Sequence, residues 1–540
     1  MTLEFVAPSP GTWLLDVVHV VRPRTRYFAS VIPEAAMQGS RDSAEFYGSP
    51  FLLHECRLVH GFPYYCARRV PDALAGERRA RTIEVFERRL WREDLRTWDQ
   101  TVKPEFLREL RELDAVAVED LADEALASHL ERVTGALARA TYRHFRWVPC
   151  FLLPVGDFLG SVAEWTGADP ADVLGMLKGS SRATLGATDE LRAASEAIAA
   201  DPTARALLAA RGDARTTLSD LRALPTVGEH VDAYVRAVGS RVLSGSDVSD
   251  ATVLEVPELV LEALRTPPQA PVVASHALDR LEAEVPEAHR AELAVALADA
   301  REHYRIRDEK GYLNDLHALG LARRTLLEIG RRAVREGRLE AAEHVLDATA
   351  EEAAQIARGA GPSADTLAAH SRYRLTTSVD VAPETLGDAP VRFQPPAGQP
   401  EALMRAGRAG ATMRRLMFDA AERPREGLSL RGLPASLGSA RGPVRIVREP
   451  GDLARVRRGD IVVAAMTTPA FNVLLPYVAG IVTERGGALS HAAILAREAG
   501  VPAVVGCRGA TTSLQDGQWI EVDGGAGSIV VVAPPDRSAT

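Results

Sequence analysis

One stretch of the sequence, residues 481–497, has the residue types and spacing needed for phosphoryl chemistry. An apolar run leads into Gly486 and Gly487, and a helical pattern begins at His491. The first N–H groups of a helix are unpaired and carry partial positive charge, so they stabilise an anion. The glycines let the backbone turn sharply, and Ser490 is placed to cap the helix. A phosphoryl group on the His491 imidazole would therefore be well held.

Three charged side chains near this histidine could assist such chemistry. Arg485 and Arg497 could neutralise phosphoryl charge, because a guanidinium matches phosphate oxygens in a bidentate manner. Glu484 could orient the imidazole. A single histidine in a helix is more often structural than catalytic, and the glycines and the helix start beside this one favour the catalytic interpretation.

The stretch resembles the phosphohistidine swivelling domain of the PEP-utilising enzyme family, which includes phosphoenolpyruvate synthase, pyruvate phosphate dikinase and rifampicin phosphotransferase. That signature is Gly-Gly, three residues, His, then small and apolar residues ending in Ala-Arg. It is matched by Gly486, Gly487, His491, Ala492, Ala493, Ala496 and Arg497. The dikinases usually have Thr where this chain has Leu489, and an apolar residue there is more similar to the antibiotic phosphotransferases. Residues 432–442, 501–506 and 516–524 resemble the opening and the close of the same domain.

The elements around this motif predict a multidomain protein. We expect a mostly α-helical substrate-binding domain followed by a C-terminal α/β phosphohistidine swivelling domain. The predicted boundaries are 1–378 for the substrate-binding-like domain, 379–430 for a linker and 431–534 for the swivelling domain. The first begins with a short aromatic, β-rich part, and 51–59 has the pattern of a strand. The linker has five prolines between 380 and 400, one helix at about 401–420 and a second break at 422–427.

The N-terminal part is rich in aromatic and histidine residues and resembles the start of the substrate-binding domain of rifampicin phosphotransferase-like enzymes. The predicted acceptor contacts are Trp13, Asp16, His19 and Arg22. Asp16 or His19 could deprotonate an acceptor hydroxyl. The alternative is an aromatic core with satisfied histidines, and residue types alone do not separate the two.

Three later segments carry weaker signals. His144, Arg146 and Trp147 precede an apolar run, 148–154, which either lines a pocket or forms a buried turn. Lys178 and Arg182 could contact a phosphoryl group or be surface charges. Near 240 the relatives more usually have Gly-His-Arg, and this chain has Ser240 at the His position, so an acid–base role there is lost or moved. Arg241 remains and could hold an anion or be solvated.

Composition excludes several other classes of function. The chain has 540 residues, a net charge of -9 and 46% hydrophobic residues, without an apolar run long enough to span a membrane and without a signal-peptide pattern. The four cysteines form no Cys-x-x-Cys pair, so neither a metal site nor a disulfide framework is indicated. The basic residues are scattered arginines, which argues against nucleic-acid binding. We therefore expect a cytoplasmic protein that binds neither a membrane nor a nucleic acid.

The relatives couple the swivelling domain to an ATP-grasp domain or to a phosphoenolpyruvate-binding barrel, and this sequence shows neither. It has no Gly-x-x-x-x-Gly-Lys-Ser/Thr loop, and residues 1–102 contain no lysine. We therefore expect a separate ATP-grasp partner that holds ATP and Mg²⁺, with no cofactor tightly bound to this chain.

These observations predict a phosphotransferase subunit that carries a phosphoryl group on His491 from that partner to a hydroxylated small molecule. One alternative is a biosynthetic ligase or dehydratase that uses transient phosphorylation. Another is a non-catalytic scaffold subunit. The departures from the family pattern at Leu489 and Ser240 favour this alternative, whereas the intact Gly-Gly…His pattern argues against it.

Overall fold

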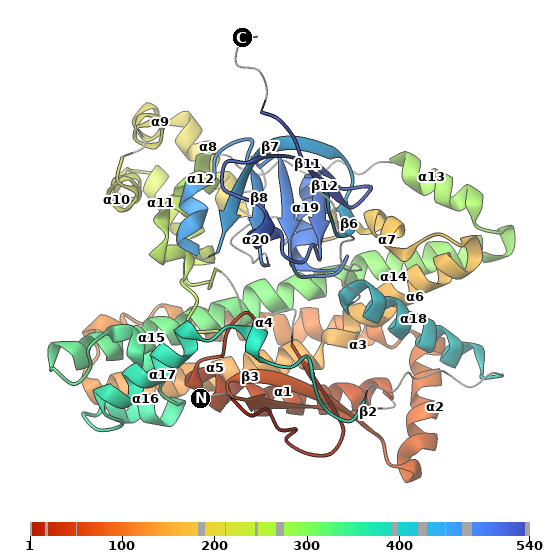
Figure 1. Cartoon of the computed structure of the whole chain (residues 1–540), viewed down its shortest axis with the longest axis horizontal. Helices are drawn as coiled ribbons and strands as arrows, with labels where there is room; N and C mark the ends of the chain where they lie inside the picture. Colours follow the sequence, from red (N-terminus) through yellow and green to blue (C-terminus); the bar gives the residue numbers. More distant parts are fainter. Residues whose placement is uncertain are drawn as a thin grey trace. The chain divides into compact units, whose positions relative to one another are not determined.

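The computed structural model describes residues 3–16, 20–49, 51–181, 189–210, 212–243, 247–265, 275–389, 398–418, 429–448, 450–466 and 478–534. The chain forms two compact units, shown in Figure 1 with colours that follow the sequence. Unit 1 comprises Met1–Pro154, Ser240–Asp250 and Ile306–Arg408. Unit 2 comprises Val155–Gly239, Ala251–Arg305 and Ala409–Thr540.

The expected fold class is confirmed in outline: the N-terminal region is mostly helical and the C-terminal region contains a large sheet. The finer division into the segments 1–378, 379–430 and 431–534 stays a prediction. The linker residues 390–397 and 419–428 lie outside the described ranges. Among the described residues, no helix is long and apolar enough to cross a membrane.

Unit 1 contains a four-stranded antiparallel sheet in the order β2-β3-β1-β4. Its strands are β1 (Thr12–Leu15), β2 (Phe51–Val59), β3 (Phe62–Arg69) and β4 (Thr385–Gly387). The strand expected at 51–59 is confirmed. One face of this sheet is apolar because Trp13, Phe62 and Tyr64 pack together with Leu15 and Leu386.

Helices cover this sheet and build the rest of unit 1. They are α1 (Arg26–Tyr47), α2 (Asp72–Arg88), α3 (Trp91–Thr97), α4 (Lys103–Asp114), α5 (Asp123–Arg146), α15 (Leu316–Arg335), α16 (Ala350–Ala357) and α17 (Ala364–Thr376). Short 3₁₀ turns are η2 (Val118–Asp120), η7 (Ala342–Asp347) and η8 (Val379–Val381). Two π-helical turns, η1 (Trp98–Val102) and η6 (Glu309–Asp315), interrupt otherwise continuous helices. Helix α1 packs against β2 and α5, and α5 packs against α15 and α16.

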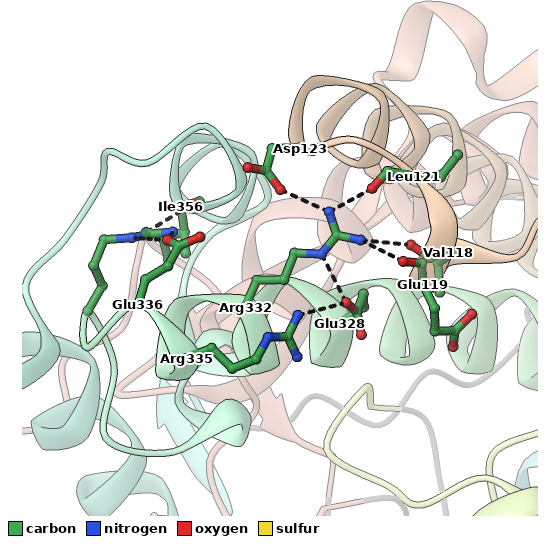
Figure 2. A network of polar contacts seen from close by, with 10 residues as sticks. Val118, Glu119, Leu121, Asp123, Glu328, Arg332, Arg335, Glu336 and Ile356 are labelled. Atoms are coloured by element: carbon green, nitrogen blue, oxygen red, sulfur yellow. Dashed lines mark hydrogen bonds and ion pairs between the residues drawn. The ribbon is translucent and has the colours of Figure 1, made fainter.

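The C-terminal half of α15 is fixed by an arginine network (Figure 2). Arg332 donates to the carbonyls of Val118, Glu119 and Leu121 and binds Asp123 at 2.8 Å. Its Nε donates to Glu328 at 2.9 Å. A guanidinium that caps a turn and pairs with carboxylates in this way ties α15 to the start of α5.

Three helices contribute residues to both units: α6 (Val148–Thr166), α14 (Arg290–Asp308) and α18 (Glu401–Phe418). The helix expected at about 401–420 is confirmed as α18. The apolar run 148–154 was expected to be a buried turn or a pocket lining; the turn was wrong because the run forms the first turns of α6, and the pocket lining stays a prediction. Pro149 fits there because the first turn of a helix has no need of its N–H.

Unit 2 has a helical part with its own core. Its helices are α7 (Pro170–Val173), α8 (Asp189–Ala200), α9 (Pro202–Ala209), α10 (Ala214–Ala223), α11 (Val227–Val238), α12 (Pro257–Arg265) and α13 (Ser275–Glu284), with the 3₁₀ turns η3 (Leu174–Leu177), η4 (Val253–Glu255) and η5 (Glu287–His289). Buried aliphatic residues such as Leu221, Val231 and Val260 come from α10, α11 and α12 and form one cluster.

The rest of unit 2 is an eight-stranded sheet with two further helices and the turn η9 (Pro450–Arg455). The strands are β5 (Ser429–Arg431), β6 (Leu433–Ser436), β7 (Ser439–Val447), β8 (Ile461–Ala464), β9 (Gly480–Thr483), β10 (Ala503–Val505), β11 (Trp519–Asp523) and β12 (Ser528–Val531). Their order is β5-β12-β11-β7-β8-β9-β10-β6, and β7 to β10 are parallel. Helix α19 (His491–Ala499) packs against β6, β9 and β10, and α20 (Ala510–Ser513) against β8. The strands expected near 444, 461 and 480 are confirmed.

Candidate active site

The predicted phosphohistidine loop has the expected local geometry. Strand β9 ends at Thr483, a turn follows, and α19 begins at His491, which is half-buried. Ser490 has extended backbone angles (φ -64°, ψ 159°), and its hydroxyl accepts the Ala493 N–H at 3.4 Å. The predicted N-cap is therefore confirmed, and His491 lies at the end of the helix where an anion is stabilised.

Gly486 is required by the turn. Its backbone φ is +110°, which residues with a side chain rarely adopt, and a Cβ there would lie 2.6 Å from the Ser490 Cβ. A larger residue would therefore displace the N-cap on which the start of α19 depends.

Gly487 is required by the close approach of α18. The Leu489 N–H donates to the Leu416 carbonyl at 3.1 Å, and a Cβ on Gly487 would lie 2.3 Å from that same oxygen. The second predicted glycine therefore gives room for the end of α18, and α18 in turn fixes the loop.

Gly487→Ala is expected to displace the end of α18 from the His491 loop and to destabilise this part of unit 2 by about 1–3 kcal/mol, because the clash is with backbone atoms. Hydrogen exchange in 413–418 and 487–493 measures the effect. Gly525→Ala is the matched control, since a Cβ at Gly525 makes only ordinary contacts of 3.4 Å or more. Equal exchange in the two variants would contradict the assignment.

The charged neighbours of His491 are held by contacts with the loop and with two neighbouring segments. Arg497 donates through Nη2 to the Ala488 carbonyl, and Arg485 donates its N–H to the Ala465 carbonyl. Glu484 accepts the Thr511 N–H at 2.7 Å and the Thr511 hydroxyl at 2.6 Å through Oε1. The structure thus brings Arg485 and Arg497 to the loop as predicted and shows the Glu484 carboxylate bound to α20; their roles toward a phosphoryl group stay predictions.

The opposite end of α19 contacts the segment around Lys178. Buried Glu498 accepts the Gly179 N–H at 2.8 Å. Lys178 thus lies near the C-terminal end of α19, where a cation is favoured, and not at its His491 end. Arg182, the other residue predicted here, lies outside the described residues.

The residues of the N-terminal part that were predicted to contact the phosphoryl acceptor differ in burial. Trp13 is 0% exposed in the sheet core, and its indole N–H donates to the Ser9 carbonyl at 2.8 Å, which favours the packing alternative. Asp16 is half-buried, and its charge raises the pKa values of Cys56 and Tyr65, although burial raises both more. Arg22 is exposed, and His19 lies outside the described residues.

Ser240, which stands at the usual histidine position, binds a carboxylate. Its hydroxyl donates to Asp114 Oδ1 at 2.7 Å, and His317 Nε2 lies 3.5 Å from Asp114 Oδ2. Arg324 donates to the same carboxylate and to the carbonyls that end α4. This group therefore joins α4 to α15, and Arg241 next to it is half-buried.

Sequence reasoning missed a second cluster of reactive groups, in unit 1. Lys310, in the π-helical turn η6, is 4% exposed, and its Nζ lies 2.9 Å from His144 Nε2. The other ring nitrogen of His144 pairs with Asp315 at the end of η6. The sequence indicated a pocket lining or a buried turn at 148–154, just after His144. Its one signal for Lys310 was the rarity of lysine, since Lys103 and Lys178 are the other two.

The pKa of Lys310 is lowered from 10.5 to about 8, chiefly by burial. Arg307 contributes to the lowering, whereas the carboxylates Asp315 and Asp308 oppose it. A lysine with this pKa is partly neutral near pH 7.5 and can exchange a proton there. The arrangement of a tuned amine, an imidazole and a carboxylate is typical of acid–base sites. Within the described ranges, no three His, Cys, Asp or Glu residues gather as a metal site would require.

Comparison with known proteins identifies part of this chain. The family "PEP-utilising enzyme, mobile domain" matches residues 456–527, which include the His491 loop. The uncharacterized phosphotransferase YvkC of Bacillus subtilis is 49% identical over 102 residues, 19% of this chain and 12% of that protein. Rifampicin phosphotransferase of Streptomyces sviceus is 43% identical over 105 residues, 19% of this chain and 12% of that enzyme.

A third relative matches almost the whole chain. Chondramide synthase cmdD of Chondromyces crocatus is 27% identical over 555 residues, which is 96% of this chain and 14% of the synthase. The matched region thus spans only 12–14% of the length of these three curated relatives.

Proposed function

Because residues 456–527 belong to the mobile domain of PEP-utilising enzymes, we propose that this chain is a phosphotransferase subunit that carries a phosphoryl group on His491. The donor is a separate nucleotide-binding protein of the ATP-grasp type, and the acceptor is a hydroxylated small molecule. The observation that carries the proposal is the position of His491 at the capped first residue of α19, after Gly486, which the turn requires, and Gly487, which the approach of α18 requires.

The two transfers balance as follows. An imidazole nitrogen of His491 attacks the terminal phosphorus of ATP, an N–P bond forms, and ADP leaves. An acceptor oxygen then attacks the same phosphorus, the N–P bond breaks, and the hydroxyl proton passes to a base. Splitting one difficult transfer in this way replaces it with two easier ones. ATP and Mg²⁺ belong to the partner in this scheme, and no cofactor is held tightly by this chain.

Lys310 is the base that the structure of unit 1 supports best. With a pKa of about 8, roughly a quarter of Lys310 is neutral at pH 7.5 and can accept the acceptor's proton. His144 lies 2.9 Å away and pairs with Asp315, so the proton can pass onward and the amine is held in place. We therefore favour Lys310 over Asp16 and His19 as the acceptor-side base, and we expect the protein in the cytoplasm, where ATP is supplied.

Intact-mass analysis with ATP, Mg²⁺ and candidate ATP-grasp proteins tests the proposal. We expect a gain of one acid-labile phosphoryl group that requires the partner and His491. Addition of pooled hydroxylated small molecules should then discharge it. Absence of loading with every partner, with ATP and with phosphoenolpyruvate would instead support the scaffold alternative.

The match to chondramide synthase favours a second candidate, in which phosphorylation is transient and serves biosynthesis. An acceptor hydroxyl that becomes a phosphate ester is a good leaving group, so elimination or condensation can follow. Recovery of inorganic phosphate with a dehydrated or condensed product would support this candidate, whereas a stable phosphate ester would exclude it.

A further inference from the structure

Two π-helical turns in unit 1 each lie between two α-helices. η1 (Trp98–Val102) lies between α3 and α4, and η6 (Glu309–Asp315) lies between α14 and α15. A π-helical turn is rare, and it inserts a residue that rotates the helix after it by about 100°. Such turns persist where other contacts hold them, so the contacts of η6 decide which way Lys310 points.

Glu309, the first residue of η6, joins the two turns. Its Oε2 accepts the Trp98 indole N–H at 2.8 Å, and its Oε1 lies 2.8 Å from Lys103 Nζ. Glu309 is 7% exposed, so both carboxylate oxygens are used in a buried place. The Trp98 ring packs against Phe106 and Trp147, with ring centroids 5.5 and 5.7 Å away.

The far end of η6 is fixed as well. Buried Asn314 donates through Nδ2 to the Ala140 carbonyl and to Asp315 Oδ1, both at 2.8 Å. Arg143 donates to Asn314 Oδ1 at 3.3 Å. Lys310 is therefore held between two anchors, and its contact with His144 joins it to α5.

We propose that Glu309 is a positioning residue: its contacts with Trp98 and Lys103 hold η6 in the π-helical register that places Lys310 against His144. Without them η6 relaxes toward an α-helical turn, which turns Lys310 away from His144 and toward water. The inference rests on the proposed function only for the importance of Lys310, and the position of Lys310 can be measured without donor or acceptor.

The test uses lysine labelled with ¹³C at Cε, because the chain has only Lys103, Lys178 and Lys310. Lys178→Arg and Lys310→Met assign the three signals. In the wild type we expect Lys310 to titrate near pH 8. In Glu309→Ala its midpoint should move toward 10.5 by at least about one pH unit, because the amine gains water.

Three further variants separate positioning from a general loss of structure. Glu309→Gln keeps an acceptor for the Trp98 indole N–H, so the titration midpoint of Lys310 should stay near pH 8. Trp98→Phe keeps a packed ring but loses the N–H donor, so the midpoint of Lys310 should shift. Exposed Glu302→Ala on α14 is the control and should change nothing. An unshifted Lys310 midpoint in both Glu309→Ala and Trp98→Phe would overturn the inference.

Phosphoryl loading of His491 by the partner should be equal in Glu309→Ala and wild type, since Glu309 does not take part in that step. A shifted Lys310 with no loading of His491 in any variant would leave the positioning role standing and would refute the proposed function. Normal loading of His491 with an unshifted titration midpoint of Lys310 would refute the positioning role and leave the proposed function standing.

Discussion

His491→Ala is expected to abolish phosphoryl loading of this chain. In the proposed mechanism the side chain supplies the nucleophilic nitrogen, whereas the capped helix start around Ser490 would only stabilise the charge that the transfer creates. We expect partner-dependent loading to fall by at least about a thousandfold, since loss of a nucleophile is not compensated by its surroundings. Intact-mass analysis with and without mild acid measures the loss.

His230→Ala is the matched control, because His230 is also half-buried in the first turn of a helix, α11, of unit 2. It should load like the wild type. His491→Gln, which keeps a polar side chain of similar size, should load no better than His491→Ala. Partner-dependent, acid-labile loading that survives in His491→Ala would refute the assignment.

Lys310→Met is expected to stop discharge of the phosphohistidine to an acceptor and, at the same time, to stabilise the protein. Loss of the base should slow discharge by about 10²–10⁴-fold while loading of His491 is unchanged. A pKa of about 8 in place of 10.5 means that burial destabilises the charged lysine by about 3 kcal/mol, and methionine avoids this cost. Opposite effects on activity and stability are typical of a functional site.

The pH dependence of this stability gain has a definite sign. Well below pH 8 Lys310 is almost fully charged in both the folded and the unfolded chain, so the wild type bears nearly the whole cost and the gain from methionine is largest. Between pH 8 and 10.5 the unfolded chain binds more protons than the folded one, so wild-type stability rises with pH and the gain shrinks. Thermal unfolding of both proteins at pH 7 and pH 10 measures the difference. A gain equal at the two pH values would contradict a lowered pKa of Lys310.

The His491 loop could be predicted from the sequence because almost every feature of that loop is local. The positive φ of Gly486, the Ser490 cap and the start of α19 all depend on residues fewer than ten positions apart. Short runs rich in apolar residues likewise predicted strands β2, β7, β8 and β9. Strands β8 and β9 are buried at every position, and a strand buried on both faces leaves such a continuous apolar run in the sequence. The sequence motif also indicated a glycine at 487. It did not indicate why a glycine is needed there, because the α18 carbonyl that Gly487 approaches comes from a separate part of the chain.

The choice between core and pocket in the N-terminal part required the folded structure. An aromatic cluster has the same composition in either place, so Trp13 was predicted as a substrate contact and is found fully buried in the sheet core. Ser240 shows the same limit: its partner Asp114 is 126 positions away, and no local pattern indicates it.

The acid–base cluster could not be predicted for a related reason. Lys310 meets His144 across 166 positions, and Glu309 meets Trp98 across 211 positions. The pKa of Lys310 is lowered chiefly by burial, and burial is a property of the folded chain. The two π-helical turns depend on these same distant contacts, since a local helical pattern predicts an α-helix through both. Local sequence therefore specifies the histidine loop, whereas the packing of helices far apart in the chain brings Lys310, His144 and Glu309 into place in unit 1.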